Sequence, residues 1–399
     1  MKYVVVLPDG VADSPMAELG GKTPLEVAKH PNMDWIAREG IAGLARTIPE
    51  GFKPGSDVGC MSVFGYDPRK YYTGRAPLEA AAQNIPLGPS DVAFRCNTVT
   101  VRDGILADYS AGHIDSGDSA ELIKTANERL GKYGLRFHAG VGYRHLAVIA
   151  GKEYAATQCT PPHDISGQSI DPHLPTGVGS ELLREVMRQS ALLLKDHQVN
   201  KRRLEQGKAP ATMFWFWGQG TAAAFPPFRT AYGLRGGCIS AVDIVRGLGR
   251  LVGFDVIPVP GITGYFDTNY KGKAEYALKA LTDHDLVLVH VEPTDEAGHM
   301  GDVKKKIQAI EDTDRLVVGT LLDGLKRRNE LFAILVVPDH PTSTALKTHI
   351  DDPVPFALYA TNGPKDAITA YTERAVLSSP TRFEEGFQLM AFFLKQGLK

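Results

Sequence analysis

The feature of the sequence that most restricts the fold is a set of short, largely β-branched apolar runs, each followed by an aspartate. These are Asp9 after KYVVVLP, Asp295 after DLVLVHVEPT and Asp339 after LFAILVVP. Runs of this length and composition are typical of buried strands. Open α/β sheets bind their ligands at the carboxyl ends of the strands. We therefore expect the three carboxylates to converge, although they are distant in the sequence.

Helix and strand patterns alternate at both ends of the chain. This alternation predicts an α/β fold with a mostly parallel sheet and helices on both faces. Residues 73–236 differ, with shorter strand candidates and one long helix candidate at 179–207. We expect residues 1–72 and 237–399 to form one domain, interrupted by an inserted second α/β domain. A cleft between two such domains is a common place for a ligand site.

The composition excludes several classes of function. The formal net charge is only −2, with both signs well mixed, so we expect neither nucleic acid nor a membrane surface as a partner. No apolar stretch approaches the roughly 20 residues of a membrane span. The four cysteines are scattered, without a CxxC pair, which favours reduced thiols and a cytoplasmic location. The sequence does not indicate an oligomeric state.

Imidazoles accompany the aspartates near the carboxyl end. A histidine follows Asp295 after one helical turn, another follows Asp339 directly, and a third lies nine residues later. With the aspartates, the predicted metal ligands are Asp9, Asp295, His299, Asp339, His340 and His349. Mixed nitrogen and oxygen donors suit Mn or Zn better than Ca. Six donors suit two ions, and two ions about 3.5–4 Å apart clamp a transferring phosphoryl group. A lone aspartate at a strand end is also typical of a turn, which stays the alternative for Asp9.

The segment GFKPGSDVGCMSVFGYDP offers a nucleophile for phosphoryl transfer. Ser56 follows a Pro-Gly turn at the start of a predicted helix. The alternative role is a helix N-cap, and the two roles are compatible. A serine at a helix amino terminus lies in positive backbone potential, and metal coordination favours its alkoxide. Ser62 is the rival, but it lies within the apolar helix and we expect it to be structural.

Eight motifs follow one another along the chain: PDG near the amino terminus, PGSDVGCMSVFGYDP, GRAPLEAAAQNI, DYSAGHID, PPHDISG, GYFDTNYKGKAE, EPTDEAGH and VVPDHPTST. In this order they resemble the cofactor-independent phosphoglycerate mutases of the archaeal type, which belong to the alkaline phosphatase superfamily. The resemblance covers nearly the whole chain and implies an alkaline-phosphatase-like sheet.

The resemblance implies a division of the ligands between two divalent ions, with Mn favoured over Zn, Co or Mg. One ion would be held by Asp295, His299 and His349, and the other by Asp9, Ser56, Asp339 and His340. Ser56 would carry the phosphoryl group as a phosphoserine. 3-Phosphoglycerate would donate its phosphate to Ser56, and the retained glycerate would take it back on its 2-hydroxyl. No 2,3-bisphosphoglycerate would be needed.

The resemblance also suggests substrate residues. Lys273 would lie beside the phosphoserine, with a solvent-facing helix lysine as the alternative and Lys271 as a weaker candidate. In the inserted domain, His113 and Arg144 would serve catalysis and the substrate carboxylate, for which a guanidinium is a natural bidentate partner. The pair His163–Asp164 could also face the cleft.

One departure leaves the substrate open. The arginine clusters of longer bacterial mutases are not found, and residues 213–228 are aromatic and glycine-rich instead. A homoserine kinase-like phosphotransferase of the same family is therefore the first alternative, although no GxxxxGK[ST] loop is present in the sequence. A metal-dependent phosphatase is the second. A degenerate metal-binding protein is the third, and the intact ligand set argues against it.

Overall fold

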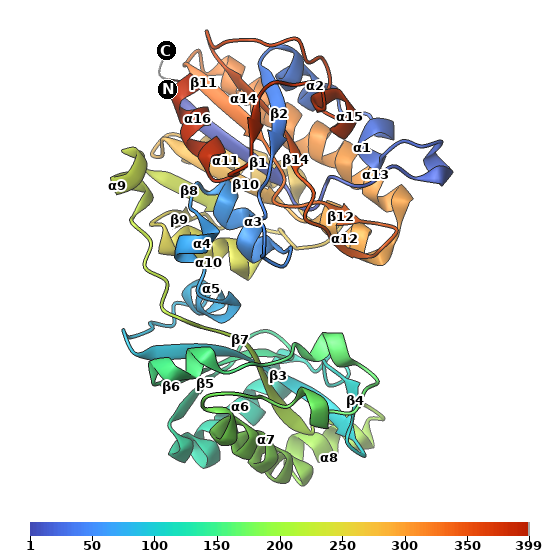
Figure 1. The fold of residues 1–399 in the computed structure, drawn as a ribbon, viewed down its shortest axis with the longest axis vertical. Coiled ribbons are helices and arrows are strands. Elements are labelled where there is room, and N and C mark those ends of the chain that lie inside the picture. Colours follow the sequence, from blue (N-terminus) through green and yellow to red (C-terminus); the bar gives the residue numbers. More distant parts are fainter. Residues whose placement is uncertain (398–399) are drawn as a thin grey trace. The chain divides into compact units, whose positions relative to one another are not determined.

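A computed structural model describes residues 1–397 of the chain. It divides into two compact units (Figure 1): unit 1 contains Met1–Tyr72 and the residues from Ala224 onward, and unit 2 is Thr73–Ala223. The sequence places the second boundary at residue 236. The structure instead assigns 224–236 to unit 1, because this segment leads into a strand of its central sheet, β8 (Gly236–Ile239).

Unit 1 is built on a mixed, mostly parallel sheet. Its strand order is β15 (Arg382–Phe383), β2 (Ile41–Ala45), β14 (Val354–Ala360), β11 (Phe332–Val336), β1 (Lys2–Pro8), β10 (Leu286–Val291), β8 and β9 (Asp255–Val256). Only the β11–β14 and β14–β2 pairs are antiparallel. The predicted α/β class with a mostly parallel sheet is confirmed.

Helices cover both faces of this sheet. On one face, Val4, Val289 and Ile334 belong to a core that also contains apolar side chains of four helices. These helices are α2 (Pro31–Arg38), α11 (Tyr270–Ala280), α13 (Val303–Asp312) and α14 (Gly319–Arg327). On the other face, Tyr3 packs edge-on against Phe393 of α16 (Gln388–Gln396) and donates a hydrogen bond to the Leu394 carbonyl. Burial of β1 on both sides explains its continuous apolar run.

The central position of β1 sets the geometry of one edge of the sheet. Its parallel pairing aligns Leu7 with His290 of β10 and Val6 with Val336 of β11. The carboxyl ends of the three strands therefore meet. The pairing continues one step further, because the Asp9 amide donates to the Val291 carbonyl at 2.9 Å.

The helix α3 (Ser56–Val63) packs closely against the residues that follow β11. A Cβ atom on Gly59 would lie 2.2 Å from the Asp339 carbonyl oxygen. The next residue, Cys60, donates from Sγ to Asp339 Oδ2 at 3.4 Å. Only glycine allows this approach, which fixes α3, and Ser56 at its start, beside Asp339.

Buried Lys306 binds two loops at this edge of the sheet, one after β1 and one after β11. Its ammonium donates to Asp13 Oδ2 at 2.9 Å, to the Ala12 carbonyl at 3.3 Å and to the Thr342 carbonyl at 2.5 Å. The loop after β1 and the segment after β11 thereby share one donor. A buried charge paired in this way costs several kcal/mol when its partner is removed.

Unit 2 has an antiparallel sheet centred on β3 (Asp91–Arg102). The other strands are β4 (Ile105–Asp108), β5 (Leu135–His138), β6 (Arg144–Ala150) and β7 (Met213–Thr221). α6 (Ser116–Leu130) and α7 (Ser180–Lys195) pack on one face, and α5 (Arg75–Ala82) packs on the other.

The prediction of one long helix at 179–207 is wrong. The segment is broken into α7 and α8 (Gln198–Glu205), because His197 lies between them in an extended conformation. Its Nδ1 accepts a hydrogen bond from the Val199 amide at 3.2 Å and so caps α8. The apolar spacing continues through the break, so periodicity alone does not reveal it.

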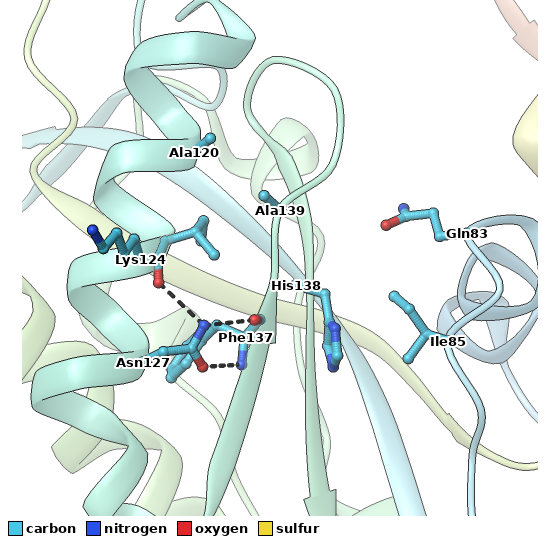
Figure 2. Close-up of a pocket in the computed structure, with 9 residues that line it drawn as sticks. Gln83, Ile85, Ala120, Lys124, Asn127, Phe137, His138 and Ala139 are labelled. Carbon is cyan, nitrogen blue, oxygen red and sulfur yellow. Dashed lines mark hydrogen bonds between the residues drawn. The ribbon is translucent and has the colours of Figure 1, made fainter.

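A cavity of about 490 Å³ lies in unit 2 beside β5 and α6 (Figure 2). Asn127 closes one wall, donating to the Phe137 carbonyl and accepting from the Phe137 amide, both at 2.8 Å. None of the lining residues is among those that the sequence predicts for the site.

Within residues 1–397, no helix has both the length and the apolar character to cross a membrane.

We predict that Gly59→Ala lowers the free energy of unfolding by about 1–3 kcal/mol, since the methyl group overpacks the α3–Asp339 contact. The control is Gly131→Ala, where no atom lies within 4 Å of the added Cβ and φ is −56°. There we expect no loss, or a gain of about 0.4–1 kcal/mol. Urea unfolding followed by circular dichroism measures both, and equal effects would contradict the packing account.

Candidate active site

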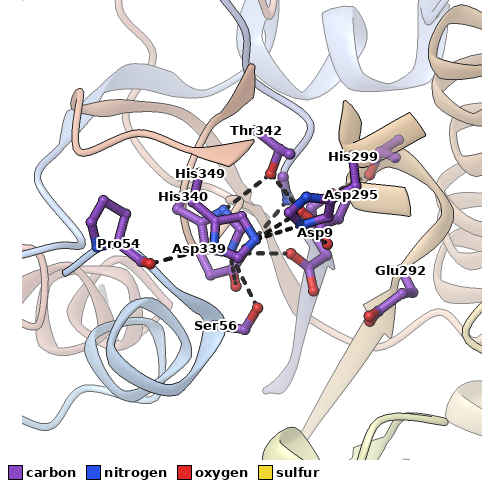
Figure 3. Close-up of polar contacts among 12 residues, drawn as sticks. Asp9, Pro54, Ser56, Glu292, Asp295, His299, Asp339, His340, Thr342 and His349 are labelled. Atoms are coloured by element: carbon purple, nitrogen blue, oxygen red, sulfur yellow. Dashed lines mark hydrogen bonds and ion pairs between the residues drawn. The ribbon is translucent and has the colours of Figure 1, made fainter. Parts of the chain in front are cut away.

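Two clusters of carboxylates and imidazoles lie at the carboxyl edge of the unit 1 sheet (Figure 3). Cluster A is Asp295, His299 and His349. Nε2 of His299 lies 3.3 Å from Asp295 Oδ2, and Nε2 of His349 lies 3.4 Å from Asp295 Oδ1. The two Nε2 atoms are 2.8 Å apart. Asp295 and His299 are one turn apart on α12 (Pro293–Met300), and His349 comes from β13 (Thr348–His349).

Cluster B is Asp9, Asp339, His340 and Ser56. Nε2 of His340 lies 3.1 Å from Ser56 Oγ, 3.3 Å from Asp339 Oδ2 and 3.6 Å from Asp9 Oδ1. Ser56 is the first residue of α3 and Gly55 holds the cap position, so Ser56 is not an N-cap. Its rival Ser62 is buried and donates to the Thr47 carbonyl at 2.6 Å, a structural role.

The hydrogen bonds of cluster A orient its imidazoles. Nδ1 of His299 lies 3.1 Å from the Lys347 carbonyl, and Nδ1 of His349 lies 3.3 Å from the Pro54 carbonyl. A carbonyl oxygen only accepts, so each Nδ1 carries the proton when the ring is neutral, and Nε2 offers its lone pair. Metal-ligating histidines are held in this way.

The donor geometry fits divalent cations. Bonds of about 2.0–2.2 Å to nitrogen and oxygen place neighbouring donors roughly 3.0–3.5 Å apart. The six separations given above for clusters A and B run from 2.8 to 3.6 Å. Asp9 Oδ1 is buried and has no hydrogen-bond partner within the described chain. The structure thus brings together all the ligands that the sequence predicts.

The two clusters differ in their electrostatics. In cluster A, burial raises the pKa of Asp295, but hydrogen bonds from His299 and His349 bring it well below its usual value. The pKa of His299 rises to about 9, chiefly through the hydrogen bond to Asp295. In cluster B, burial and the charges of Asp339, Asp295 and Glu292 raise the pKa of Asp9 well above its usual value. A bound cation would relieve that repulsion.

A third group of ligand type adjoins cluster B and was missed in the sequence. Nε2 of His290 lies 2.9 Å from Asp9 Oδ2 and 3.5 Å from Glu292 Oε2. Burial lowers the pKa of His290 to about 3. The available signal was a histidine inside a strand that is otherwise apolar and buried on both faces.

Lys273 lies near this group. It is fully buried, and its ammonium donates to the His290 carbonyl at 2.8 Å. Burial lowers its pKa to about 8. The solvent-facing alternative for Lys273 is therefore wrong. Lys271 does face solvent, where it pairs with Glu275 at 3.4 Å.

In unit 2 the predicted substrate residues gather around aromatic rings. The rings of His113 and Tyr143 are 6.4 Å apart, and the Arg144 guanidinium lies 4.7 Å from the Tyr143 ring. Tyr109 joins this group to His163, since its ring centre lies 5.7 Å from that of Tyr143 and 6.3 Å from that of His163. Asp164 is exposed, 3.5 Å from His163 Nε2.

Further basic residues lie beside this aromatic group and were also missed. Arg95 is buried, lies 4.0 Å from the Trp217 ring and pairs with Glu79 at 3.0 Å. Burial lowers its pKa to about 10, with Glu79 opposing and Arg75 adding to the shift. The His163 ring is 5.1 Å from Trp217. Arg95 and Asn97 alternate within an apolar strand, and this alternation was the available signal.

The carboxyl edge of this mostly parallel sheet thus has two groups of donors suited to divalent ions and a serine beside them, a combination compatible with two-metal phosphoryl transfer. Comparison with known proteins narrows this class. Residues 37–200 match the family model for 2,3-bisphosphoglycerate-independent phosphoglycerate mutase. A mutase of that name from Methanothrix thermoacetophila is 51% identical over 99% of this chain and 100% of its own length. A probable one from Geobacter sulfurreducens is 51% identical over 99% of this chain and 100% of its length.

Solved structures agree. A protein from Pyrococcus horikoshii matches with a TM-score of 0.83 and 29% identity, over 100% of this chain and 98% of that one. The cofactor-independent phosphoglycerate mutase of Thermoplasma acidophilum matches with a TM-score of 0.68 and 29% identity, over 99% of both. The chain belongs to the family of 2,3-bisphosphoglycerate-independent phosphoglycerate mutases, which are isomerases. The resemblance seen in the motifs is confirmed.

We predict that Mn²⁺ binding to cluster A releases protons at neutral pH. His299 has a pKa of about 9, and the ion needs the neutral imidazole, so affinity rises with pH and levels off above that value. Titration calorimetry in buffers of different ionisation enthalpy measures the proton count, and His299→Gln is the control that loses it. An affinity that does not change between neutral pH and the pKa of His299 would contradict the prediction.

Proposed function

We propose that this mutase transfers the phosphoryl group of 3-phosphoglycerate to Ser56 and returns it to the 2-hydroxyl of the same glycerate, at a site holding two divalent ions. Cluster A would hold one ion and cluster B the other, with Mn²⁺ favoured by the mixed nitrogen and oxygen donors. No 2,3-bisphosphoglycerate takes part, in keeping with the family.

One observation carries the proposal: Ser56 is the accessible member of cluster B. Asp9, Asp339 and His340 are fully buried, whereas Ser56 is half-buried. Its hydroxyl is therefore the ligand-type group of that cluster that an incoming phosphate can reach. Its place at the first residue of α3 adds positive backbone potential, which stabilises negative charge on Oγ.

The chemistry follows from this position. Ser56 Oγ loses its proton and attacks phosphorus, and the bond from phosphorus to the 3-oxygen of glycerate breaks. That oxygen takes up a proton, and glycerate then turns within the site. Its 2-hydroxyl loses a proton and attacks the phosphoserine, and Ser56 Oγ leaves. Bound divalent ions would neutralise charge on the phosphoryl group and favour the serine alkoxide.

Each unit, taken by itself, contains candidate substrate residues. Lys273 would lie beside the phosphoserine. In unit 2 these residues would be His113, Arg144, His163 and Asp164, and Arg95 lies beside them, already paired with Glu79. A small hydroxy acid would lie against the neighbouring rings of Tyr109, Tyr143 and Trp217. Arg144 would bind its carboxylate through two parallel hydrogen bonds.

Two other reactions remain as outcomes of the test. Phosphorylation of homoserine from ATP would use the same nucleophile with another donor. Release of free phosphate would follow if water reached the phosphoserine. The mutase reaction therefore requires that water be excluded while glycerate stays bound.

We predict that the protein with Mn²⁺ forms 2-phosphoglycerate from 3-phosphoglycerate without added bisphosphoglycerate, and that Ser56→Ala lowers kcat by roughly 10³–10⁶-fold, as expected when a nucleophile is removed. An enolase-coupled assay measures the rate. Ser62→Ala is the matched control, from the same helix, and should keep its activity.

Acid-quenched protein should carry label from [³²P]3-phosphoglycerate, and Ser56→Ala should carry none. Retained turnover in Ser56→Ala would contradict the proposal. So would free phosphate as the main product, or ATP-dependent phosphorylation of homoserine in place of mutase activity.

We predict that Arg144→Lys raises KM by about 10–100-fold with a smaller change in kcat, because a charged hydrogen-bonding partner contributes roughly 1.5–3 kcal/mol and lysine lacks the planar fork. Arg136→Lys is the control, since Arg136 pairs with Asp91 at 2.9 Å. Steady-state kinetics with 3-phosphoglycerate decides it, and equal KM values in the two variants would remove Arg144 from the substrate site.

A further inference from the structure

The two carboxylate oxygens of Asp9, a proposed ligand in cluster B, face different partners. Oδ1 faces His340 at 3.6 Å and has no hydrogen bond in the described part of the chain. Oδ2 lies 2.9 Å from Nε2 of His290. A carboxylate that binds an ion through one oxygen is oriented by a hydrogen bond to its other oxygen. Without that bond the carboxylate can rotate, and the position of the ligating oxygen changes.

A relay of hydrogen bonds crosses three neighbouring strands to reach Asp9. Ser240 directly follows β8, His290 lies in β10 and Asp9 directly follows β1. The sheet register pairs Ile239, the residue before Ser240, with Val289, and it pairs Leu7, two residues before Asp9, with His290. Ser240 Oγ is 3.0 Å from His290 Nδ1, and all three residues are buried.

The partner of Nδ1 sets His290 apart from the histidines of cluster A. Their Nδ1 atoms face carbonyls, which only accept, whereas Nδ1 of His290 faces a hydroxyl, which can donate. The Val242 amide already donates to Ser240 Oγ at 2.9 Å. The Ser240 hydroxyl also lies 3.4 Å from the Val242 carbonyl, but Nδ1 is the closer acceptor at 3.0 Å. When the hydroxyl donates to Nδ1, Nε2 carries the hydrogen that Asp9 Oδ2 accepts.

The rival interpretation is a third cation held by Asp9, His290 and Glu292, whose donor atoms lie close enough together. One observation opposes it. The ammonium of Lys273 lies 2.8 Å from the His290 carbonyl and adds a positive charge beside the group. The distance of 2.9 Å from Asp9 Oδ2 to Nε2 fits a hydrogen bond as well as a shared ion, and the test below separates the two.

We propose that His290, anchored by Ser240, is a positioning residue for the ion of cluster B: it donates to Asp9 Oδ2 and leaves Oδ1 free for the ion. The proposal rests on the two-ion centre proposed above. In this role His290 would contact neither the ion nor the substrate. It acts through Asp9, whose main chain is held separately by the Val291 carbonyl and by Thr294 Oγ1.

The test measures Mn²⁺ binding by calorimetry and metal analysis in the full-length protein, with Asp295→Asn added to leave cluster B as the remaining site. We expect His290→Leu to weaken Mn²⁺ binding there by roughly 10–100-fold, the usual effect of losing such a partner. His290→Gln keeps an N–H donor and should recover most of the affinity. Ser240→Ala, the milder variant, should weaken binding by about 2–10-fold.

His284→Leu is the matched control. It removes a buried histidine before β10 that is paired with Asp255 at 2.9 Å, and it should lower stability without changing the Mn²⁺ affinity. Unchanged affinity in both His290→Leu and Ser240→Ala overturns the inference and leaves the two-ion centre intact. A third ion in the wild type that is lost in His290→Leu and in Glu292→Gln also overturns it. A wild type that binds no ion removes the two-ion centre and this inference together.

Discussion

The parallel pairing of β1 between β10 and β11 is the constraint on which the rest of the site depends. It brings Asp9, Asp295 and Asp339 to one edge although they lie far apart in the sequence. The pairing is stabilised by burial of apolar side chains on both faces of β1. This burial is compatible with the polar backbone of the paired strand, because β10 and β11 accept and donate its hydrogen bonds. The carboxylates that the apolar strands deliver are then left close together with like charges.

That crowding of charge explains the rest of the arrangement. Burial and the neighbouring carboxylates raise the pKa of Asp9, whereas hydrogen bonds from two imidazoles hold that of Asp295 low. Each cluster thus has its own balance of charge, and the proposed ions complete both. Lys306 and Gly59 hold the neighbouring segments in position. Lys306 binds the loop after β1 and the segment after β11, and Gly59 allows α3 to approach Asp339.

The sequence was most informative where a functional residue directly follows a recognisable apolar strand. The strands before Asp9, Asp295 and Asp339 could be predicted because doubly buried strands are continuously apolar, and their polar ends stand out. His290 was missed because it lies inside such a strand, and only the folded structure shows that its side chain contacts Asp9. Arg95 was missed because its partner Trp217 comes from a strand paired across more than a hundred residues. The break at His197 depends on a side-chain cap that leaves the apolar spacing unchanged.

The central claim is that two separate ions bind at this edge of the sheet, with Ser56 in contact with one of them. Anomalous diffraction from crystals grown with Mn²⁺ tests it most directly. The account predicts two peaks, one among Asp295, His299 and His349 and the other among Asp9, Ser56, Asp339 and His340. A single peak, or a second peak outside the reach of Ser56 Oγ, would contradict it.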